Sequence, residues 1–135
     1  MTWEPRPLPV VTPETREFWG ATTDNELRLC HCQDCGLTYY YPRARCPDCL
    51  SDEVESIEAT GHGVVYSYTV TETVSDWPSD TLPLVVAYVE LEEGPRLLTN
   101  LVHCNPEKAE IGIEVEVTFI ETDNADIAIP VFEPR

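Results

Sequence analysis

Long apolar runs are missing from this 135-residue chain. None approaches the ~18 residues needed to cross a bilayer. The opening residues, Met1–Glu4, also lack the basic and apolar pattern of a signal peptide. We therefore expect a protein with no membrane span and no leader, located in the cytoplasm.

Lysine is almost absent as well. Lys108 is the only lysine among 8 basic residues, and these stand against 25 acidic residues, for a formal net charge of −17. The acids are dispersed, and hydrated carboxylates keep a protein soluble in concentrated salt, where screening weakens their repulsion. The composition therefore predicts a halophilic source, with an ordinary acidic protein as the alternative. This charge also opposes binding to a phosphate backbone.

No pattern typical of a catalytic site is visible. The three histidines have no partner that the sequence identifies, and neither Ser67 nor Ser75 has the context of a nucleophile. His103 and Cys104 are adjacent, but neighbours on a strand point to opposite faces, which is poor geometry for proton transfer. We therefore expect Cys104 to be structural and the protein to be non-catalytic.

Cysteine, in contrast, is present in an informative arrangement. Cys32 and Cys35 form one Cys-x-x-Cys pair, and Cys46 and Cys49 form a second. This spacing is typical of a closed, tetrahedral zinc ribbon, in which the metal supports folding. Iron in a rubredoxin-type site, disulfides and free thiols are the alternatives, and Zn²⁺ is favoured because no redox motif accompanies the four thiolates. Gly36 can adopt the positive φ needed after the first pair.

Two residues beside the first pair could compete for the metal. Cys30 and His31 precede it directly. The symmetrical spacing favours Cys32 and Cys35, so we expect Cys30 and His31 to be flanking residues. Thiolate ligands persist most easily in a reducing compartment, which also favours the cytoplasm.

The expected fold class is mainly β, with an N-terminal helix, a rubredoxin-like zinc ribbon and a C-terminal OB-fold β-barrel. Thr12 as N-cap and Pro13 at the first position predict a helix that ends near Thr22 or Thr23. The expected domains are the arm and helix at 1–26, the ribbon at 27–53 and the barrel at 54–135. Five strands are predicted for the barrel, at 54–60, 63–73, 84–92, 96–103 and 114–121, with 127–132 returning along its edge. A helical turn capped by Asn105 precedes the last long strand, as in OB folds.

Aromatic residues leave two questions open. Trp3, Phe18 and Trp19 can either pack onto the ribbon or dock a partner. Three tyrosines on the predicted barrel strands can either stack nucleotide bases or pack at alternating positions, and packing is favoured. These tyrosines are Tyr66, Tyr68 and Tyr88.

Several stretches together carry a family resemblance over nearly the whole chain. They are CQDCG (32–36), YPR (41–43), CPDC (46–49), GHGVVYSYT (61–69) and EEGPRLLTNL (92–101). The chain resembles the zinc-ribbon/OB-fold proteins of the acyl-CoA-associated "domain of unknown function 35" family. Leu50 departs from the glycine that often follows the second cysteine pair in this family.

The resemblance implies a non-catalytic subunit of a thiolase-type or enoyl-CoA hydratase-type assembly. Archaeal members bridge an acetoacetyl-CoA thiolase and a hydroxymethylglutaryl-CoA synthase, in early isoprenoid synthesis, and help to enclose the CoA passage. We therefore expect a scaffold with these partners and with coenzyme A or an acyl-CoA at a shared interface. Arg43, Arg45 and Arg96 are the candidates for contact with CoA phosphates or with carboxylates of a partner, and surface ion pairing is the alternative. The alternative functions are a nucleic-acid-binding module and a subunit of an acyl-CoA hydratase or aldolase.

Overall fold

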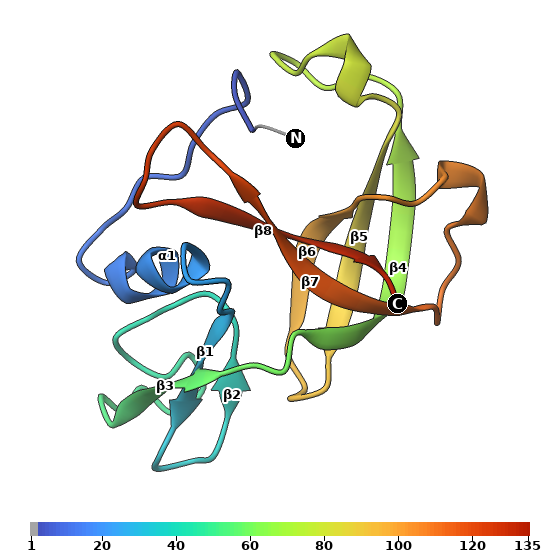
Figure 1. The fold of residues 1–135 in the computed structure, drawn as a ribbon. Coiled ribbons are helices and arrows are strands. Elements are labelled where there is room, and N and C mark those ends of the chain that lie inside the picture. Colours follow the sequence, from blue (N-terminus) through green and yellow to red (C-terminus); the bar gives the residue numbers. More distant parts are fainter. Residues whose placement is uncertain (1–2) are drawn as a thin grey trace.

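The computed structural model describes residues 3–135 and contains two β-units, with helix α1 packed beside both (Figure 1). The elements are α1 (Arg16–Thr22), β1 (Arg28–Cys32), β2 (Thr38–Tyr39), β3 (Val54–Glu58), β4 (His62–Thr71), η1 (Ser79–Thr81), β5 (Leu84–Leu91), β6 (Arg96–Leu101), η2 (Pro106–Lys108), β7 (Glu114–Glu121) and β8 (Ala128–Pro134). The predicted fold class, a helix followed by a zinc ribbon and an OB-fold barrel, is confirmed. No helix within residues 3–135 is long and apolar enough to cross a membrane.

Helix α1 begins later than predicted. Its N-cap is Thr15, not Thr12, and its last residue is Thr22, as expected. Thr12 N–H donates to Thr15 Oγ1 at 2.9 Å, and Thr15 N–H donates to Thr12 Oγ1 at 3.3 Å. These reciprocal bonds hold 12–15 as a turn, because threonine side chains offer the backbone an alternative to the first helical turn.

The first β-unit is a three-stranded sheet in the order β2-β1-β3. Strand β3 lies antiparallel to β1, from Arg28 opposite Glu58 to Cys32 opposite Val54. The prediction that residues 54–60 form the first barrel strand is therefore wrong. The chain leaves the second cysteine pair beside β1, and pairing there completes the ribbon before the barrel begins.

The second β-unit is a closed barrel in the order β4-β5-β6-β8-β7. Residues 127–132, expected only at its edge, belong to a full strand: β8 pairs antiparallel with β7 from Val115–Pro134 to Glu121–Ala128. The barrel closes between β6 and β8, where the parallel pairing is confined to Leu101 opposite Phe132. A turn at 92–95 joins β5 to β6, and the predicted Asn105 cap of η2 is present.

Gly63, within β4, permits a close approach between two barrel strands. A Cβ on Gly63 would lie 2.6 Å from the Glu90 carbonyl oxygen, so only glycine lets β4 approach β5 this closely. The β-bulge of this strand lies further along, between Val65 and Ser67.

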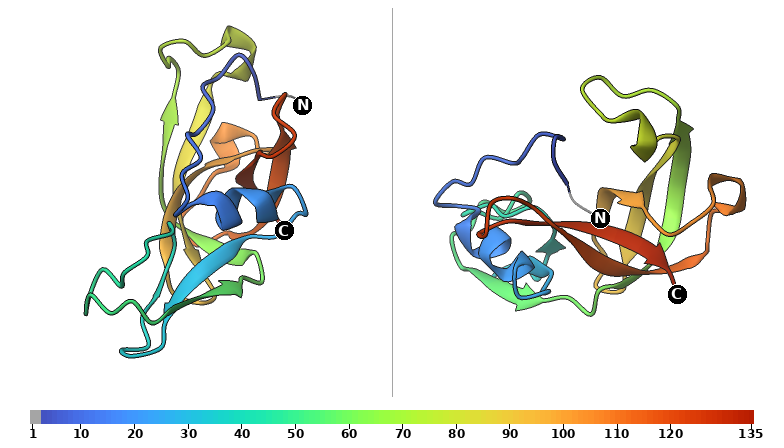
Figure 2. Two further views of the ribbon diagram at one scale, coloured as in Figure 1. Left: turned by 90° about the vertical axis from the view of Figure 1, so that its left-hand side faces the viewer. Right: turned by 45° about the horizontal axis from the view of Figure 1, so that its top comes forward.

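One apolar core runs through both units. Phe18 and Leu29 of the helix and ribbon belong to the same buried cluster as Val89 and Phe132 of the barrel. Helix α1 lies at the junction of the two units (Figure 2). Phe18 and Trp19 are buried, as is Trp3 in a smaller cluster with Ile120 and Val131. These aromatic side chains therefore pack inside the chain.

Thr22 ties the helix to the barrel. Its side chain is fully buried, and its hydroxyl donates to the Trp19 carbonyl at 2.6 Å. The same oxygen accepts the backbone N–H of Ala128 in β8 at 3.1 Å. A single side chain therefore links the end of α1 to a barrel strand.

Candidate metal centre

The first pair of cysteines lies in a turn at the end of β1. Gly36 N–H donates to the Cys32 carbonyl at 2.9 Å, and Cys32 N–H donates to the Leu37 carbonyl at 2.8 Å. Gly36 has a φ of +82°, as predicted for this position. The turn brings the Cys35 N–H within 3.5 Å of Cys32 Sγ, where it can stabilise a thiolate.

The second pair repeats this geometry. Leu50 N–H donates to the Cys46 carbonyl at 3.0 Å, and Cys46 N–H donates to the Ser51 carbonyl at 2.9 Å. The Cys49 N–H lies 3.5 Å from Cys46 Sγ. Leu50 has a φ of +64°, so it occupies the left-handed conformation that glycine adopts in the first turn. The turn therefore forms without glycine, at the cost of crowding the Leu50 side chain against its own backbone.

The two turns bring all four predicted cysteines together. Their Sγ atoms lie within 4.8 Å of one another. The Cys32–Cys49 and Cys35–Cys46 sulfur pairs are each 3.6 Å apart. Tetrahedral Zn–S bonds of ~2.3 Å place sulfurs about 3.8 Å apart, so the cluster fits this metal in size and in ligand softness. The four cysteines form the metal-binding site of a zinc ribbon.

The electrostatics of the cluster favour a bound cation. Hydrogen bonding from the Cys35 N–H lowers the pKa of Cys32 to about 7. Cys35 is exposed as a residue, and the Leu37 N–H lowers its pKa, but local desolvation of its sulfur and the three neighbouring thiols outweigh this and raise the pKa to about 12. Four thiolates this close repel one another unless a cation lies among them, so the site is built for a metal.

Neither flanking residue joins the cluster. Cys30 lies on β1 opposite Tyr39, and burial raises the pKa of its thiol. His31 Nδ1 is 3.1 Å from Thr38 Oγ1. Both are structural neighbours of the site, as predicted.

His103 and Cys104 differ from their predicted geometry. Strand β6 ends at Leu101, and His103 has a φ of +53°, so the two side chains do not alternate across a strand. His103 Nδ1 lies 2.5 Å from Glu133 Oε2, and Cys104 is half-buried. His103 and Cys104 line a cavity of about 520 Å³ at one end of the barrel, together with Trp77. No local pattern indicates the Glu133 contact, because it joins residues 30 positions apart.

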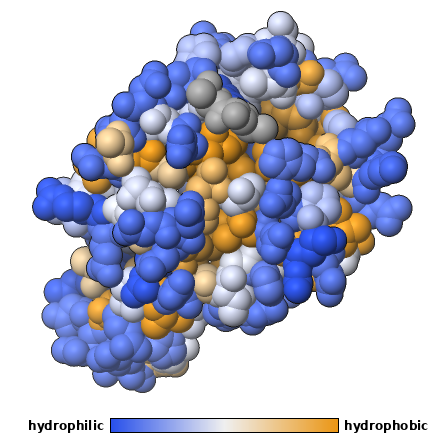
Figure 3. Space-filling view, viewed as in Figure 1, coloured by the Kyte–Doolittle hydropathy of each residue, from blue (hydrophilic) through white to orange (hydrophobic). Residues whose placement is uncertain are grey.

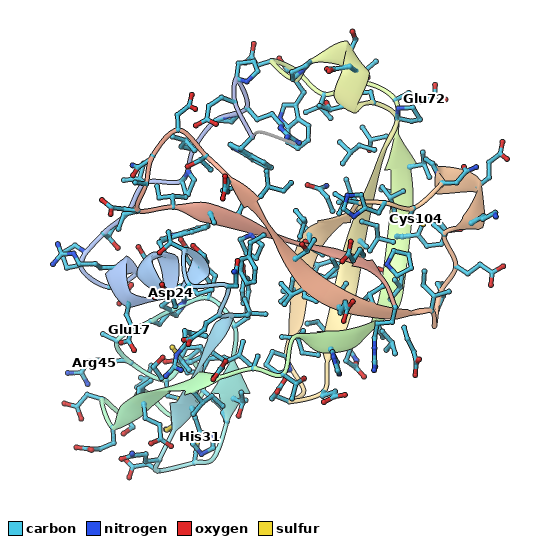
Figure 4. All side chains as sticks on the ribbon, viewed as in Figure 1. Glu17, Asp24, His31, Arg45, Glu72 and Cys104 are labelled. Carbon is cyan, nitrogen blue, oxygen red and sulfur yellow. The ribbon has the colours of Figure 1, made fainter. Side chains whose placement is uncertain are left out.

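The candidate arginines lie in two places. Arg43 lines a ribbon groove of about 220 Å³ with Cys30, and Arg45 Nη1 donates to the Leu50 carbonyl at 3.2 Å. Figure 4 shows Arg45 on the outer side of the ribbon. Arg96 lies on the barrel, with its Nε 2.9 Å from Glu90 Oε2. The structure therefore does not gather the three into one site.

The barrel tyrosines are not packed inside. Tyr66, Tyr68 and Tyr88 are each at least two-fifths exposed, so the favoured prediction of barrel packing is wrong. Elsewhere, hydrophilic side chains cover most of the surface in Figure 3, as the composition implies.

Two family models cover the ribbon and most of the barrel. The model described as "ChsH2, rubredoxin-like zinc ribbon domain" matches residues 19–55, and "ChsH2, C-terminal OB-fold domain" matches residues 56–119. A "DUF35 domain-containing scaffold protein" of Methanothermobacter thermautotrophicus is 42% identical over 89 residues, which is 65% of this chain and 67% of that protein. The chain belongs to the DUF35 family.

Two further relatives cover more of the chain. A "Probable enoyl-CoA hydratase alpha subunit" of Thermomonospora curvata is 38% identical over 129 residues, or 96% of this chain. The chain spans only 40% of the length of that subunit. A solved structure named "Ltp2-ChsH2(DUF35) aldolase" contains a chain that is 37% identical, with a TM-score of 0.82 and coverage of 94% of this chain and 98% of that one.

Proposed function

We propose that this DUF35 chain is a non-catalytic accessory subunit that serves as a scaffold in an acyl-CoA enzyme assembly. The observation that carries the proposal is the match, over nearly the full length of both chains, to the DUF35 chain of a solved aldolase. The archaeal relatives are named scaffold proteins, and the Thermomonospora relative is named as a hydratase subunit. The metal site uses four cysteines, so a bound Zn²⁺ has no open position and would stabilise the ribbon rather than react.

The finer form of the proposal is a bridge between an acetoacetyl-CoA thiolase and a hydroxymethylglutaryl-CoA synthase in the mevalonate pathway. The identity of 42% to an archaeal scaffold protein supports it. A second candidate is a subunit of an acyl-CoA hydratase or aldolase. The hydratase relative, which matches 96% of this chain, and the aldolase structure favour that second candidate.

Purification of the native complex separates these candidates. The full chain, affinity-tagged and expressed in its source cells, is isolated in molar KCl, and the proteins that elute with it are identified by mass spectrometry. Recovery of a thiolase and a synthase supports the bridge, and recovery of a hydratase or aldolase supports the second candidate. A monomer that binds oligonucleotides and carries no enzyme overturns the scaffold proposal, and such binding should weaken steeply with salt.

Contact with coenzyme A is a separate part of the proposal. Arg43 and Arg45 of the ribbon, or Arg96 of the barrel, contact CoA phosphates or partner carboxylates, because guanidinium groups bind both bidentately. Charge reversal at each position, such as Arg43→Glu, is expected to weaken either CoA binding or assembly. Intact CoA binding and intact assembly in all three variants contradict this part alone.

The acidic composition also suggests the salt concentration in which the protein works. We place the protein in the reducing cytoplasm of a salt-accumulating cell, because its net charge is −17 with one lysine. Raising KCl from 0.1 M to 2 M should then raise the thermal midpoint of the isolated chain, since salt screens carboxylate repulsion. A midpoint that falls or stays level across this range contradicts the halophilic interpretation.

A further inference from the structure

We propose that the outer face of strands β4, β5 and β6 is the surface on which this chain docks a protein partner, one that is apolar at the centre of its contact surface and basic at its rim. This inference rests on the proposed scaffold function and assigns a surface to it. The three strands lie side by side in the barrel (Figure 1).

Strand pairing defines the face. Three cross-strand rows lie on it, namely Val64–Glu90–Arg96, Ser67–Tyr88–Leu98 and Thr69–Val86–Asn100. Alternate residues between these rows, such as Val65, Val89 and Leu97, are buried in the barrel. The rows therefore point outward, away from the core. We call these nine residues and Tyr66 the tyrosine face.

The bulge in β4 adds Tyr66 to this face. The register shifts between Val65 and Ser67, so Tyr66 is an extra residue beside the row of Tyr88. In an unbroken strand, Tyr66 and Ser67 would point to opposite sides. The bulge turns both toward solvent, and bulges are often found where a side chain must be re-aimed.

Arg96 is held in place on the face before any partner arrives. Its guanidinium lies 3.8 Å from the centre of the Tyr66 ring. Its Nε donates to Glu90 Oε2 at 2.9 Å. A stacked and paired arginine loses less side-chain freedom on binding than a free one, which favours its use at the centre of an interface.

The face exposes large apolar side chains at positions where the barrel would also fold with polar ones. Leu98 is 59% exposed, Tyr66 48% and Tyr88 47%. Antiparallel sheets usually carry polar residues on their solvent side. Tyrosine and arginine are enriched at interfaces and among their energetic anchors, so this composition is typical of a docking surface.

Charge identifies the kind of occupant. Glu90 and Arg96 are the only charged members of the tyrosine face, so the face is neutral in a chain of net charge −17. Carboxylates border one end of it: Glu114 lies opposite Val64 on β7, and Glu92 and Glu93, in the turn after β5, accept hydrogen bonds from Thr60. A neutral apolar centre within an acidic rim matches a partner with apolar anchors ringed by lysine or arginine.

The same charges disfavour the other occupants. OB folds bind oligonucleotides on this side of the barrel, but the single cation here is already paired with Glu90. The repeated phosphates of an oligonucleotide would also meet the acidic rim. A second copy of the chain would place two acidic rims against each other.

The test uses the acyl-CoA enzyme that co-purifies with the full chain. Leu98→Asp places a charge in the middle row of the face, and Ile111→Asp is the matched control, because Ile111 is 70% exposed and lies outside the face. We expect Leu98→Asp to weaken enzyme binding at least ten-fold, with Ile111→Asp unchanged. Enzyme binding that Leu98→Asp leaves intact overturns the inference, while the scaffold function stands.

A second measurement does not depend on a variant. Hydroxyl-radical labelling of Tyr66 and Tyr88 should fall when the wild-type chain is in complex with the enzyme. Equal labelling in both states contradicts the inference. A dimer of the isolated chain broken by Leu98→Asp, or binding of a dT20 oligonucleotide lost in Tyr88→Ala, also overturns it. Recovery of no acyl-CoA enzyme overturns the scaffold function itself and the inference with it.

Discussion

The ribbon and the barrel are both small β-units, yet different interactions hold them together. The barrel surrounds buried apolar side chains such as Val89 and Phe132. At the far end of the ribbon, the fully buried groups are Cys32 and Cys46. A unit of two short turns and three strands buries too little apolar surface to be stable alone, so a metal supplies what the core does not.

The two units nevertheless share one apolar core where they meet. Phe18 and Leu29 extend the barrel core into the helix and ribbon, and Thr22 fixes the helix to β8. The near end of the ribbon therefore depends on packing, while its far end depends on metal. The boundary between the two kinds of stabilisation thus lies inside the ribbon and not between the domains.

Metal removal gives the largest expected effect. Structural zinc supplies about 10–16 kcal/mol of folding free energy in small zinc domains, so chelation should unfold the ribbon. Hydrogen exchange should rise for amides of the two cysteine turns and stay slow in β4–β8. The Cys46→Ser variant should reproduce this, and Cys104→Ser should not. Equal loss of protection in both units contradicts separate stabilisation of ribbon and barrel.

A cavity in the barrel core should destabilise the barrel and leave the metal site intact. Phe132 is fully buried, and Phe132→Ala is expected to lower the free energy of unfolding by about 3–5 kcal/mol. The metal content of the folded protein should stay unchanged. Urea denaturation and metal analysis measure the two quantities, with Val10→Ala on the surface as the control. Parallel loss of metal indicates that the two units fold as one.

The link between the units is tested at Thr22. Thr22→Val keeps the shape of the side chain but leaves the Ala128 N–H without its acceptor, which should cost about 1–3 kcal/mol. The exposed neighbour Thr23 bonds only within its helix, to the Gly20 carbonyl, so Thr23→Val should change stability by less than about 0.5 kcal/mol. Equal effects in thermal denaturation show that the hydroxyl does not couple helix and barrel.

The smallest effect is expected at the second cysteine turn. Leu50 has a φ of +64° and is 67% exposed, so Leu50→Gly relieves backbone crowding and loses little packing. The gain should be about 1 kcal/mol, or a few-fold in metal affinity against a competing chelator. Gly36→Ala, at the matching position of the first turn, should weaken the site by a similar amount. Weaker metal binding by Leu50→Gly indicates that Leu50 contributes a contact in the complex.

The metal site could be predicted because its information is local. The spacing of two residues between paired cysteines determines each turn, with help from Gly36 in the first one. The hydrogen bonds of each turn lie within six residues, so they depend little on the remainder of the chain. The barrel strands were also recognisable, because alternating burial is read directly from the chain. Alternation does not reveal which sheet a strand joins, so Val54–Glu58 was placed in the barrel while it pairs with β1.

Other differences arise from single side chains that change a regular pattern. The bulge at Tyr66 breaks the alternation, so Tyr66 and Tyr88 share the outer face, while Tyr68 lies opposite the buried Ala87. Thr15 accepts a hydrogen bond from the Thr12 N–H, so the helix begins after Thr15 and not at Pro13 as predicted. The His103–Glu133 contact joins a loop to β8. Such contacts depend on the assembled fold, and no window of sequence contains them.

The two cysteine turns also give the metal site an inside and an outside. Cys32 and Cys46 are buried, while Cys35 and Cys49, one from each turn, face solvent. Electrophiles and oxidants therefore reach the sulfurs of Cys35 and Cys49 first. Each turn can lose this exposed ligand while its buried cysteine still binds the metal. We therefore expect chemical modification of this protein to start at Cys35 and Cys49, on the outer side of the ribbon and away from the barrel, and to affect the shared apolar core last.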